Sequence, residues 1–313
     1  MRNANRNLFI NPVGRELLTL LSVILLVILA RCQSSLTIPE PQGHIVFTSR
    51  IDRNSEIFIM DADGSNLTQL THNEEADYDP AISPDGSKVA FSSERHGYGE
   101  LYVVNVDGAG QMRLTFDQKL VRGPAWSPDG AWIGFSRGGP IAEIDDIYLI
   151  RPDGSELTRL TDDPGLTAGF AWSPDGTQIA FTSNRDGGVI RSMFDVYIIN
   201  IDGSGLRRLT NHPASDGVED WSPDGRYILF SSNRDMSRNE QRVYVMDLES
   251  GEFWPLIADE EDSPRRQLNA SWSPDGNWVV LTLDKQMCIV SKEGEVWQCF
   301  GGDYQYGQPD WGP

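Results

Sequence analysis

The residues best suited to metal or nucleophilic chemistry in this 313-residue chain are four histidines and three cysteines. Zinc hydrolysis commonly uses H-E-x-x-H or closely spaced Cys and His ligands, and acyl transfer often uses G-x-S-x-G. None of these patterns occurs. His72, His96 and His212 are far apart in the sequence, but they could meet on one face of a fold and bind a metal ion. An enzyme, a lyase or a hydrolase, is therefore the alternative hypothesis, and a non-catalytic protein is the leading one.

Carboxylates are the most abundant charged groups, and the formal net charge is −20. A surface this acidic repels phosphate backbones, which argues against nucleic-acid binding and favours a soluble monomer with basic partners or cations. Asp61–Gly64 resembles the start of a calcium loop but lacks the downstream glutamate, so a hairpin turn is expected there. No cofactor is predicted, although a structural cation such as Ca²⁺ could lie in a polar channel.

The elements that position these residues follow from a repeat. The tetrapeptide SPDG occurs five times, starting at Ser83, Ser127, Ser173, Ser222 and Ser273. Tryptophan precedes it in four of the five copies, and Ile82 in the first. A period of about 40–50 residues with several short strands is typical of a β-propeller blade.

Each repeat predicts four antiparallel strands. A short strand leads into SPDG, where Pro presets φ and Gly accepts positive φ in a tight turn. A second strand such as 178–183 follows, then a variable loop, a third strand such as 196–199, a second turn, and a fourth strand that ends in Leu-Thr.

The two ends of the chain decide the number of blades. The first repeat begins at its second strand, 44–49, while the last residues, Pro309–Trp311, match a first strand. Five complete blades and two complementary fragments predict an all-β, six-bladed propeller closed by the C-terminal strand. Closure removes exposed strand edges.

Two stretches carry a family resemblance: Phe181–Asp186 (FTSNRD) and Pro124–Gly130 (PAWSPDG). They resemble the WD40-like PD40 repeats of the TolB-type propeller, and the resemblance covers about residues 43–313. It implies a periplasmic partner of a peptidoglycan-associated lipoprotein. TolB also has an N-terminal α/β domain, which the short segment before residue 43 does not accommodate, so a propeller-only relative is expected. Prolyl-oligopeptidase-type peptidases carry similar repeats, but no hydrolase domain is expected after residue 313.

Binding sites are expected on two parts of such a propeller. One is the face formed by the variable second-to-third strand loops and the blade connections, because loops carry function on a rigid scaffold. The other is the channel, where mixed polar groups could bind a cation or an extended peptide, or simply face water. The candidates near the channel mouth are Asp77, Asp79, Arg122, Asp216, Asn269 and Tyr306.

Cys288 and Cys299 occupy positions that are aromatic and leucine in the other repeats. In an exported protein this pair predicts a disulfide in the sixth blade, and two buried free thiols are the alternative.

The N-terminus predicts export. Residues 1–32 contain three arginines, an apolar run from Leu17 to Ala30, and then Arg31 and Cys32. The run is short for a membrane span and suits a secretory signal. Cys32 is a candidate for lipidation, although Arg31 departs from the lipoprotein pattern, and an uncleaved anchor or cleavage nearby remains open. Residues 33–42 read as a linker to a propeller at 43–313.

Together these features predict a non-catalytic, exported TolB-like propeller that binds a protein or a glycan at the cell envelope. It would be periplasmic or on the cell surface, tethered to the membrane through its N-terminus.

Overall fold

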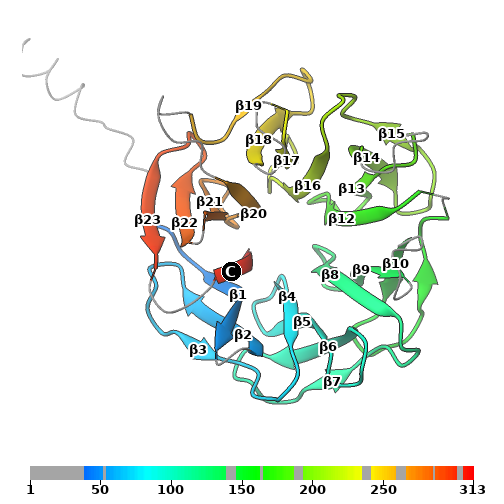
Figure 1. Cartoon of the computed structure of the whole chain (residues 1–313), viewed down its shortest axis with the longest axis vertical. Coiled ribbons are helices and arrows are strands. Elements are labelled where there is room, and N and C mark those ends of the chain that lie inside the picture. The colour runs from blue at the N-terminus through cyan, green and yellow to red at the C-terminus, as the bar shows by residue number, and fades with distance from the viewer. Residues whose placement is uncertain are drawn as a thin grey trace, which may run out of the picture. The chain divides into compact units, whose positions relative to one another are not determined.

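The computed structural model describes residues 39–51, 54–138, 146–162, 165–186, 193–234, 241–258, 266–284, 286–301 and 306–313. Pro41–Pro313 form one compact unit. In it, 24 strands make six antiparallel sheets of four strands, arranged as blades around a central axis (Figure 1). The predicted all-β, six-bladed propeller is confirmed. Within the described ranges, the chain has no helix that is long and apolar enough to cross a membrane.

Blade 1 consists of β24-β1-β2-β3, and blades 2 to 6 follow in sequence order from β4 to β23. The innermost strands are β24 (Tyr306–Gly312), β4 (Asp77–Ile82), β8 (Leu120–Trp126), β12 (Thr167–Trp172), β16 (Asp216–Trp221) and β20 (Gln267–Trp272). The second strands are β1 (His44–Ile51), β5 (Lys88–Ser93), β9 (Ile133–Gly138), β13 (Gln178–Ser183), β17 (Tyr227–Ser232) and β21 (Trp278–Leu283).

The third strands are β2 (Asn54–Asp61), β6 (Glu100–Asn105), β10 (Asp146–Ile150), β14 (Asp195–Asn200), β18 (Arg242–Asp247) and β22 (Gln286–Ser291). The outer strands are short: β3 (Thr68–Gln69), β7 (Met112–Arg113), β11 (Thr158–Arg159), β15 (Arg207–Arg208), β19 (Phe253–Pro255) and β23 (Val296–Phe300).

The ring is closed by β24, as the sequence predicts. It pairs antiparallel with β1, with Trp311 opposite Ile45 and Asp310 opposite Val46. The Trp311 indole N–H donates to the carbonyl of Gln42 at 2.8 Å. The two ends of the propeller therefore meet in one sheet, which Figure 1 shows as the last strand lying beside the first.

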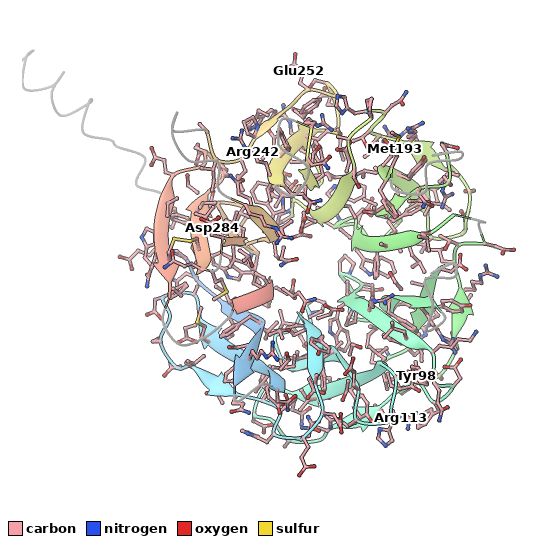
Figure 2. All side chains as sticks on the ribbon, in the orientation of Figure 1. Tyr98, Arg113, Met193, Arg242, Glu252 and Asp284 are labelled. Atoms are coloured by element: carbon pink, nitrogen blue, oxygen red, sulfur yellow. A yellow bond between two sulfur atoms is a disulfide. The ribbon has the colours of Figure 1, made fainter. Side chains whose placement is uncertain are left out.

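The core consists of six separate apolar layers, one between each pair of neighbouring blades. One layer joins Val46 and Ile57 of blade 1 to Val89 and Phe91 of blade 2, and the other five repeat this arrangement. A blade is apolar on both faces because each face is covered by a neighbour. Side chains fill the spaces between blades all round the ring (Figure 2).

The SPDG turns also interlock. In each, the serine hydroxyl donates to the aspartate two residues later, as Ser83 does to Asp85 at 2.6 Å. The turn glycine has positive φ, and a Cβ added at Gly130 would lie 3.9 Å from Pro84 of the preceding blade. Turn geometry and packing between blades thus explain why the motif recurs.

The Leu-Thr pairs at the outer strands serve a polar network. In blade 2, Thr115 donates to the buried carboxylate of Glu100 and accepts from the backbone N–H of Leu101. Arg113 on β7 reaches the same carboxylate at 2.9 Å. Blades 3 and 4 repeat the set with Thr161, Asp146 and Arg159, and with Thr210, Asp195 and Arg208. The network fastens each short outer strand to the third strand.

Blade 6 has a disulfide between Cys288 and Cys299, which lie opposite each other on β22 and β23 with Cα atoms 4.0 Å apart (Figure 2). The expected equivalence of Cys299 with leucine is wrong by one residue. Opposite the third-strand aromatic, the other blades have Gln69, Arg113, Arg159, Arg208 and Pro255. In the other five blades leucine follows the third-strand aromatic at the same spacing, as Leu70 follows Phe58, and that spacing from Cys288 leads to Phe300.

Candidate functional site in the central channel

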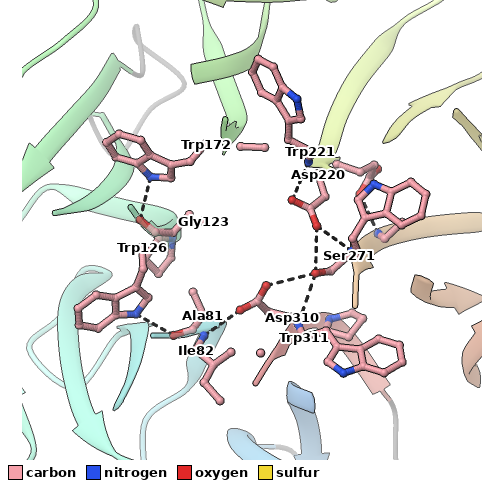
Figure 3. A pocket seen from close by; sticks show the side chains of 18 of the residues that line it. Ala81, Ile82, Gly123, Trp126, Trp172, Asp220, Trp221, Ser271, Asp310 and Trp311 are labelled. Atoms are coloured by element: carbon pink, nitrogen blue, oxygen red, sulfur yellow. Dashed lines mark hydrogen bonds between the residues drawn. The ribbon is translucent and has the colours of Figure 1, made fainter. Parts of the chain in front are cut away.

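The innermost strands surround a cavity of about 710 Å³ that opens on the face carrying the SPDG turns. All six blades contribute the end of their innermost strand, and blades 2 to 6 also contribute residues of the turn that follows it. Prolines of the turns, such as Pro84 and Pro128, form its rim, and the tryptophans that precede SPDG stand behind the wall (Figure 3). The volume falls within the ~300–1,000 Å³ range of ligand sites.

The wall of this cavity differs from one side to the other. In the position immediately before the tryptophan or Ile82, blades 2, 3 and 4 carry Ala81, Ala125 and Ala171. Blades 5, 6 and 1 carry Asp220, Ser271 and Asp310 in the same position. At this position the wall is therefore small and apolar in blades 2 to 4 and polar in blades 5, 6 and 1.

The serine at this position links the two carboxylates. The Ser271 hydroxyl lies 3.2 Å from Asp220 Oδ2 and 3.3 Å from Asp310 Oδ1, so it bridges two carboxylates from different blades (Figure 3). We call Asp220, Ser271 and Asp310 the polar sector.

The carboxylates also satisfy strand edges that would otherwise be unpaired. Asp220 accepts from the backbone N–H of Trp272 at 2.7 Å, and Asp310 accepts from that of Ile82 at 2.8 Å. Asp79 accepts in the same way from Gly123 at 2.9 Å. In each case the N–H belongs to the innermost strand of the next blade. An unmet buried N–H is costly, so these bonds hold neighbouring blades in place.

A kink in the inner strands brings such side chains into the channel. Five of the six have a residue with φ near +50°, three positions before the tryptophan or Ile82. These are Asp79, Gly123, Gly169, Asn269 and Gln308. Blade 5 has the β-branched Val218 there, which does not adopt positive φ. In this blade Glu219 instead points inward and accepts from the N–H of Ala270 at 3.1 Å.

Desolvation sets the acidity of these groups. Burial raises the pKa of Asp220 to about 7, and the nearby charge of Asp310 adds to the effect. Burial also raises the pKa of Glu219 to about 7 and that of Asp310 to about 6. The pKa of Asp79 is raised by burial too. With pKa values raised to about 6 to 7, we expect part of the polar sector to be protonated near neutral pH.

The structure brings two of the six candidate channel residues into the cavity wall, Asp79 and Asn269. Arg122 lies next to it, exposed, and its charge acts on Asp79. Tyr306 pairs through its backbone with Ser49, and its side chain lies outside the described residues.

Asp77 and Asp216 lie elsewhere, at the opposite ends of their strands. Each is fully buried and forms an ion pair, Asp77 with Arg95 at 2.9 Å and Asp216 with Arg234 at 2.8 Å. The guanidinium of Arg95 also lies 4.6 Å from the ring centre of Tyr102. In blades 2 and 5 this aspartate–arginine–aromatic stack gives the Ser-x-Arg loop a structural role that needs no ligand.

The three loop histidines do not assemble into a site. His96 Nδ1 pairs with the Tyr102 hydroxyl at 2.6 Å, and His212 accepts from the N–H of Ala214. His72 is exposed in the connection between blades 1 and 2. Among the described residues, no group of three or more His, Cys, Asp or Glu side chains is placed to hold a metal ion.

The variable face is described only in part. Every position after residue 38 outside the described ranges falls in its second-to-third strand loops or blade connections. Cys32 and residues 1–38 also lie outside the described residues.

Sequence reasoning missed the polar sector and Glu219. A signal was present, because aligning the repeats on SPDG puts Asp220, Ser271 and Asp310 in a position that is alanine in the other three blades.

Two family models match successive parts of the chain. The TolB β-propeller domain matches residues 38–142, and the N-terminal β-propeller domain of tricorn protease matches residues 141–292. A TolB homolog from Chlorobaculum tepidum is 40% identical over 53 residues, which is 17% of this chain and 12% of the homolog.

Solved structures show the same fold. TolB from Acinetobacter baumannii superposes with a TM-score of 0.73 at 23% identity, covering 87% of this chain and 67% of that one. An oligogalacturonate lyase in complex with manganese superposes with a TM-score of 0.57 at 17% identity, covering 83% of this chain and 77% of that one.

The fold and cavity thus define a six-bladed β-propeller with an open channel mouth. More specifically, the propeller is TolB-like: residues 38–142 match the TolB β-propeller domain, and the solved TolB shares the fold.

Proposed function

We propose that this protein is an exported, non-catalytic binding scaffold of the cell envelope. In this proposal the channel mouth takes an extended segment of a partner protein. The single observation that supports it is the 710 Å³ cavity with a polar sector on one side and an apolar wall on the other. The resemblance to TolB and the N-terminal apolar segment support export, with the propeller outside the cytoplasm.

The chemistry of the wall suggests what the segment carries. Three carboxylic groups, Glu219, Asp220 and Asp310, stand on one side with raised pKa values. A basic or amide group in the ligand would donate hydrogen bonds to these desolvated carboxylic groups, and a cation would favour their ionised form. An aliphatic part would contact the alanines opposite. We therefore expect a segment that contains lysine or arginine beside small apolar residues.

Binding of a cation should release protons, because it lowers the pKa of groups that are partly protonated near pH 7. Affinity should then rise as the pH increases through the range of about 6 to 7 set by these groups.

Site-specific photo-crosslinking in the native envelope tests the proposal. A photoreactive amino acid in place of the rim residue Pro128 should crosslink a defined partner. The same amino acid in place of Leu157, which is 44% exposed next to an outer strand, is the matched control. Crosslinks from Leu157 but not from Pro128 would reject the channel as the binding site.

The same experiment addresses the enzyme alternative. If the captured partner or an added peptide were returned with a changed mass, and Asp220→Asn abolished the change, the protein would be catalytic. An intact partner is the outcome that we expect.

A further inference from the structure

A second hollow lies beside the channel, on the seam between blades 5 and 6. It is a cleft of about 450 Å³ on the face that carries the turns. Blade 5 supplies Tyr227 and Trp254, and blade 6 supplies Asp275, Lys292 and Glu293. Trp272 lines its inner part, toward the channel.

One wall of this seam cleft is aromatic. Trp254 is 42% exposed on β19, and its ring meets that of Tyr227 edge to face, with centroids 6.0 Å apart. Buried Val245 lies opposite Trp254 in the register and completes the wall. At the position of Trp254 the other blades have Thr68, Met112, Thr158, Arg207 and Gln298. An aromatic residue at this position is therefore found in blade 5 and in none of the other five blades.

The opposite wall is polar and contains both acceptors and donors. Asp275 is exposed and receives bonds from Ser273 and Asn277, while Asp224 at the near rim uses one oxygen for Ser222. The Lys292 ammonium lies 3.5 Å from Asn277 Oδ1, beside Glu293.

A buried donor without a partner marks the inner part of the cleft. Trp272 is 5% exposed, and its indole N–H has no hydrogen-bond partner among the residues that the structure describes. The corresponding groups of Trp126 and Trp172 donate to carbonyls of the preceding blade at 3.1 and 3.2 Å. An unmet buried donor is destabilising, so its place beside a cleft suggests that an acceptor arrives with a ligand.

The walls are held apart at a fixed distance by contacts at both ends. At the inner turns, a Cβ added at Gly276 would lie 3.6 Å from Pro223. At the outer end, Gly294 approaches the Leu256 carbonyl so closely that an added Cβ would lie 2.0 Å from the oxygen. The cleft is thus formed before any ligand arrives, which limits the entropic cost of binding.

We infer that the seam cleft between blades 5 and 6 is a binding site for a neutral oligosaccharide. A sugar ring has an apolar C–H face that can stack on the exposed indole of Trp254. Its hydroxyls both donate and accept, which matches the carboxylates, Lys292 and the free N–H of Trp272.

A lysine or arginine side chain fits this cleft less well. Such a group only donates, so it would leave the Trp272 N–H unmet and would lie near the Lys292 ammonium. The ring of Tyr227 already has a cation beside it, because Arg226 lies 5.1 Å from its centre and pairs with Asp247. A ligand cation would have to compete with this arginine. This site is independent of the channel proposal.

Titration calorimetry of the full-length protein, in a detergent without a sugar headgroup, tests the inference. The probes are cellotetraose, chitotetraose and maltotetraose, each to about 10 mM, since weak single sites bind at about 1 mM. At least one should bind saturably. Trp254→Ala should weaken that binding at least about tenfold, and Trp254→Phe should retain most of it, because the phenyl ring still offers a stacking face.

Trp297→Ala is the matched control, because Trp297 is 41% exposed on the outer strand of the next blade and does not line the cleft. It should bind sugar like the parent, and so should Asp310→Asn, which alters the channel alone. The inference is overturned if none of the three sugars binds, or if Trp254→Ala binds like the parent. It is also overturned if tetra-arginine binds at Trp254 and the sugars do not.

Discussion

Blades 2 to 4 differ from blades 5 and 6 in the contacts that attach the outer strand to the blade. Each must hold a short outer strand, which pairs with the third strand over only a few residues. Blades 2 to 4 use a buried carboxylate, a threonine and an arginine, as Glu100, Thr115 and Arg113 do in blade 2. The sequence departs from this set in blades 5 and 6, where the third strands begin with Arg242 and Gln286.

Blade 5 replaces the network with aromatic packing. Phe253 of β19 meets Phe230 and Tyr244 edge to face, with ring centroids 5.9 and 6.0 Å apart. Arg234 lies 4.3 Å from the centre of the Phe253 ring. Blade 6 uses the disulfide instead, and Cys299 stands where Arg113, Arg159 and Arg208 stand in the regular blades.

The same two blades supply most of the unusual surface. Asp220, Ser271 and Glu219 of the channel belong to them, and so do both walls of the seam cleft. Where the repeat is strict, its residues are explained by turns, caps and packing. Where it departs, side chains are exposed to cavities that could receive a ligand. In this molecule the departures from the repeat are the better guide to function.

Removal of the closing strand should lower the stability of the propeller more than any other change. Without residues 306–313, β1 loses its inner partner and the apolar layer between blades 6 and 1 loses Trp311. Since a domain is stable by only about 5–15 kcal/mol, we expect cooperative unfolding to be lost. Thermal denaturation followed by circular dichroism measures this.

Trp311→Ala is the milder comparison, because it keeps the strand pairing and costs about 3–5 kcal/mol. If the truncated chain melted at the parent temperature, ring closure by β24 would contribute nothing to stability.

The disulfide comes next. Cys288→Ser with Cys299→Ser should lower the free energy of unfolding by about 3 kcal/mol, because the bond closes a short loop in the unfolded chain. Chemical denaturation of parent and variant, with and without dithiothreitol, gives the value. The parent should become as unstable as the variant when reduced, and the variant should not respond. A parent insensitive to reduction would show that blade 6 is held by packing alone.

Much of the fold could be predicted from the sequence because the turns repeat. SPDG marks the first-to-second turn of blades 2 to 6, and the late start at His44 with the final Trp311 fixes both the blade number and the closure. The register of Cys299 was also within reach of the sequence, because the constant spacing from the third-strand aromatic to leucine puts Phe300, and not Cys299, in the leucine position.

The candidate site was harder to predict than the fold. Asp77 and Asp79 are two residues apart on β4, yet one forms an ion pair with Arg95 and the other lines the cavity. The positive φ at Asp79 changes the direction of the strand between them. Alternation along a regular strand would have put both on the same side.

A smaller loss of stability is expected when a threonine of the buried network is replaced than when the closing strand or the disulfide is removed, and an exposed threonine should matter less still. Thr115→Val keeps the shape of the side chain but leaves Glu100 and the N–H of Leu101 without their shared partner. We expect a loss of about 1–3 kcal/mol, typical of an unmet buried group. Thr158→Val, on an exposed outer strand, should change stability by less than about 0.5 kcal/mol. Equal effects in urea denaturation would contradict a structural role for the network.

The last contrast, which is spread over several pH units, is between the turn aspartates and the channel carboxylates. Hydrogen bonds from Ser83 and Ser87 lower the pKa of Asp85 to about 2, whereas burial raises that of Asp220 to about 7. The turn aspartates therefore stabilise the fold above their unfolded pKa, and this stability is lost as the pH falls toward 2. Asp220 has the opposite sign, because the folded chain keeps a proton that the unfolded chain has released.

Stability should therefore fall as the pH rises from about 4 to 7, by up to about 1.4 kcal/mol per pH unit for each channel carboxylate. Asp220→Asn removes one titrating group, so its free energy of unfolding should depend less steeply on pH over that range. Asp63→Asn, at an exposed turn whose carboxyl pKa is lowered by Ser65, is the control and should leave the slope between about pH 5 and 7 unchanged. Denaturation curves of the three proteins at several pH values decide the matter. If the slope of Asp220→Asn equalled that of the parent, the polar sector would be solvated and ionised like the turns.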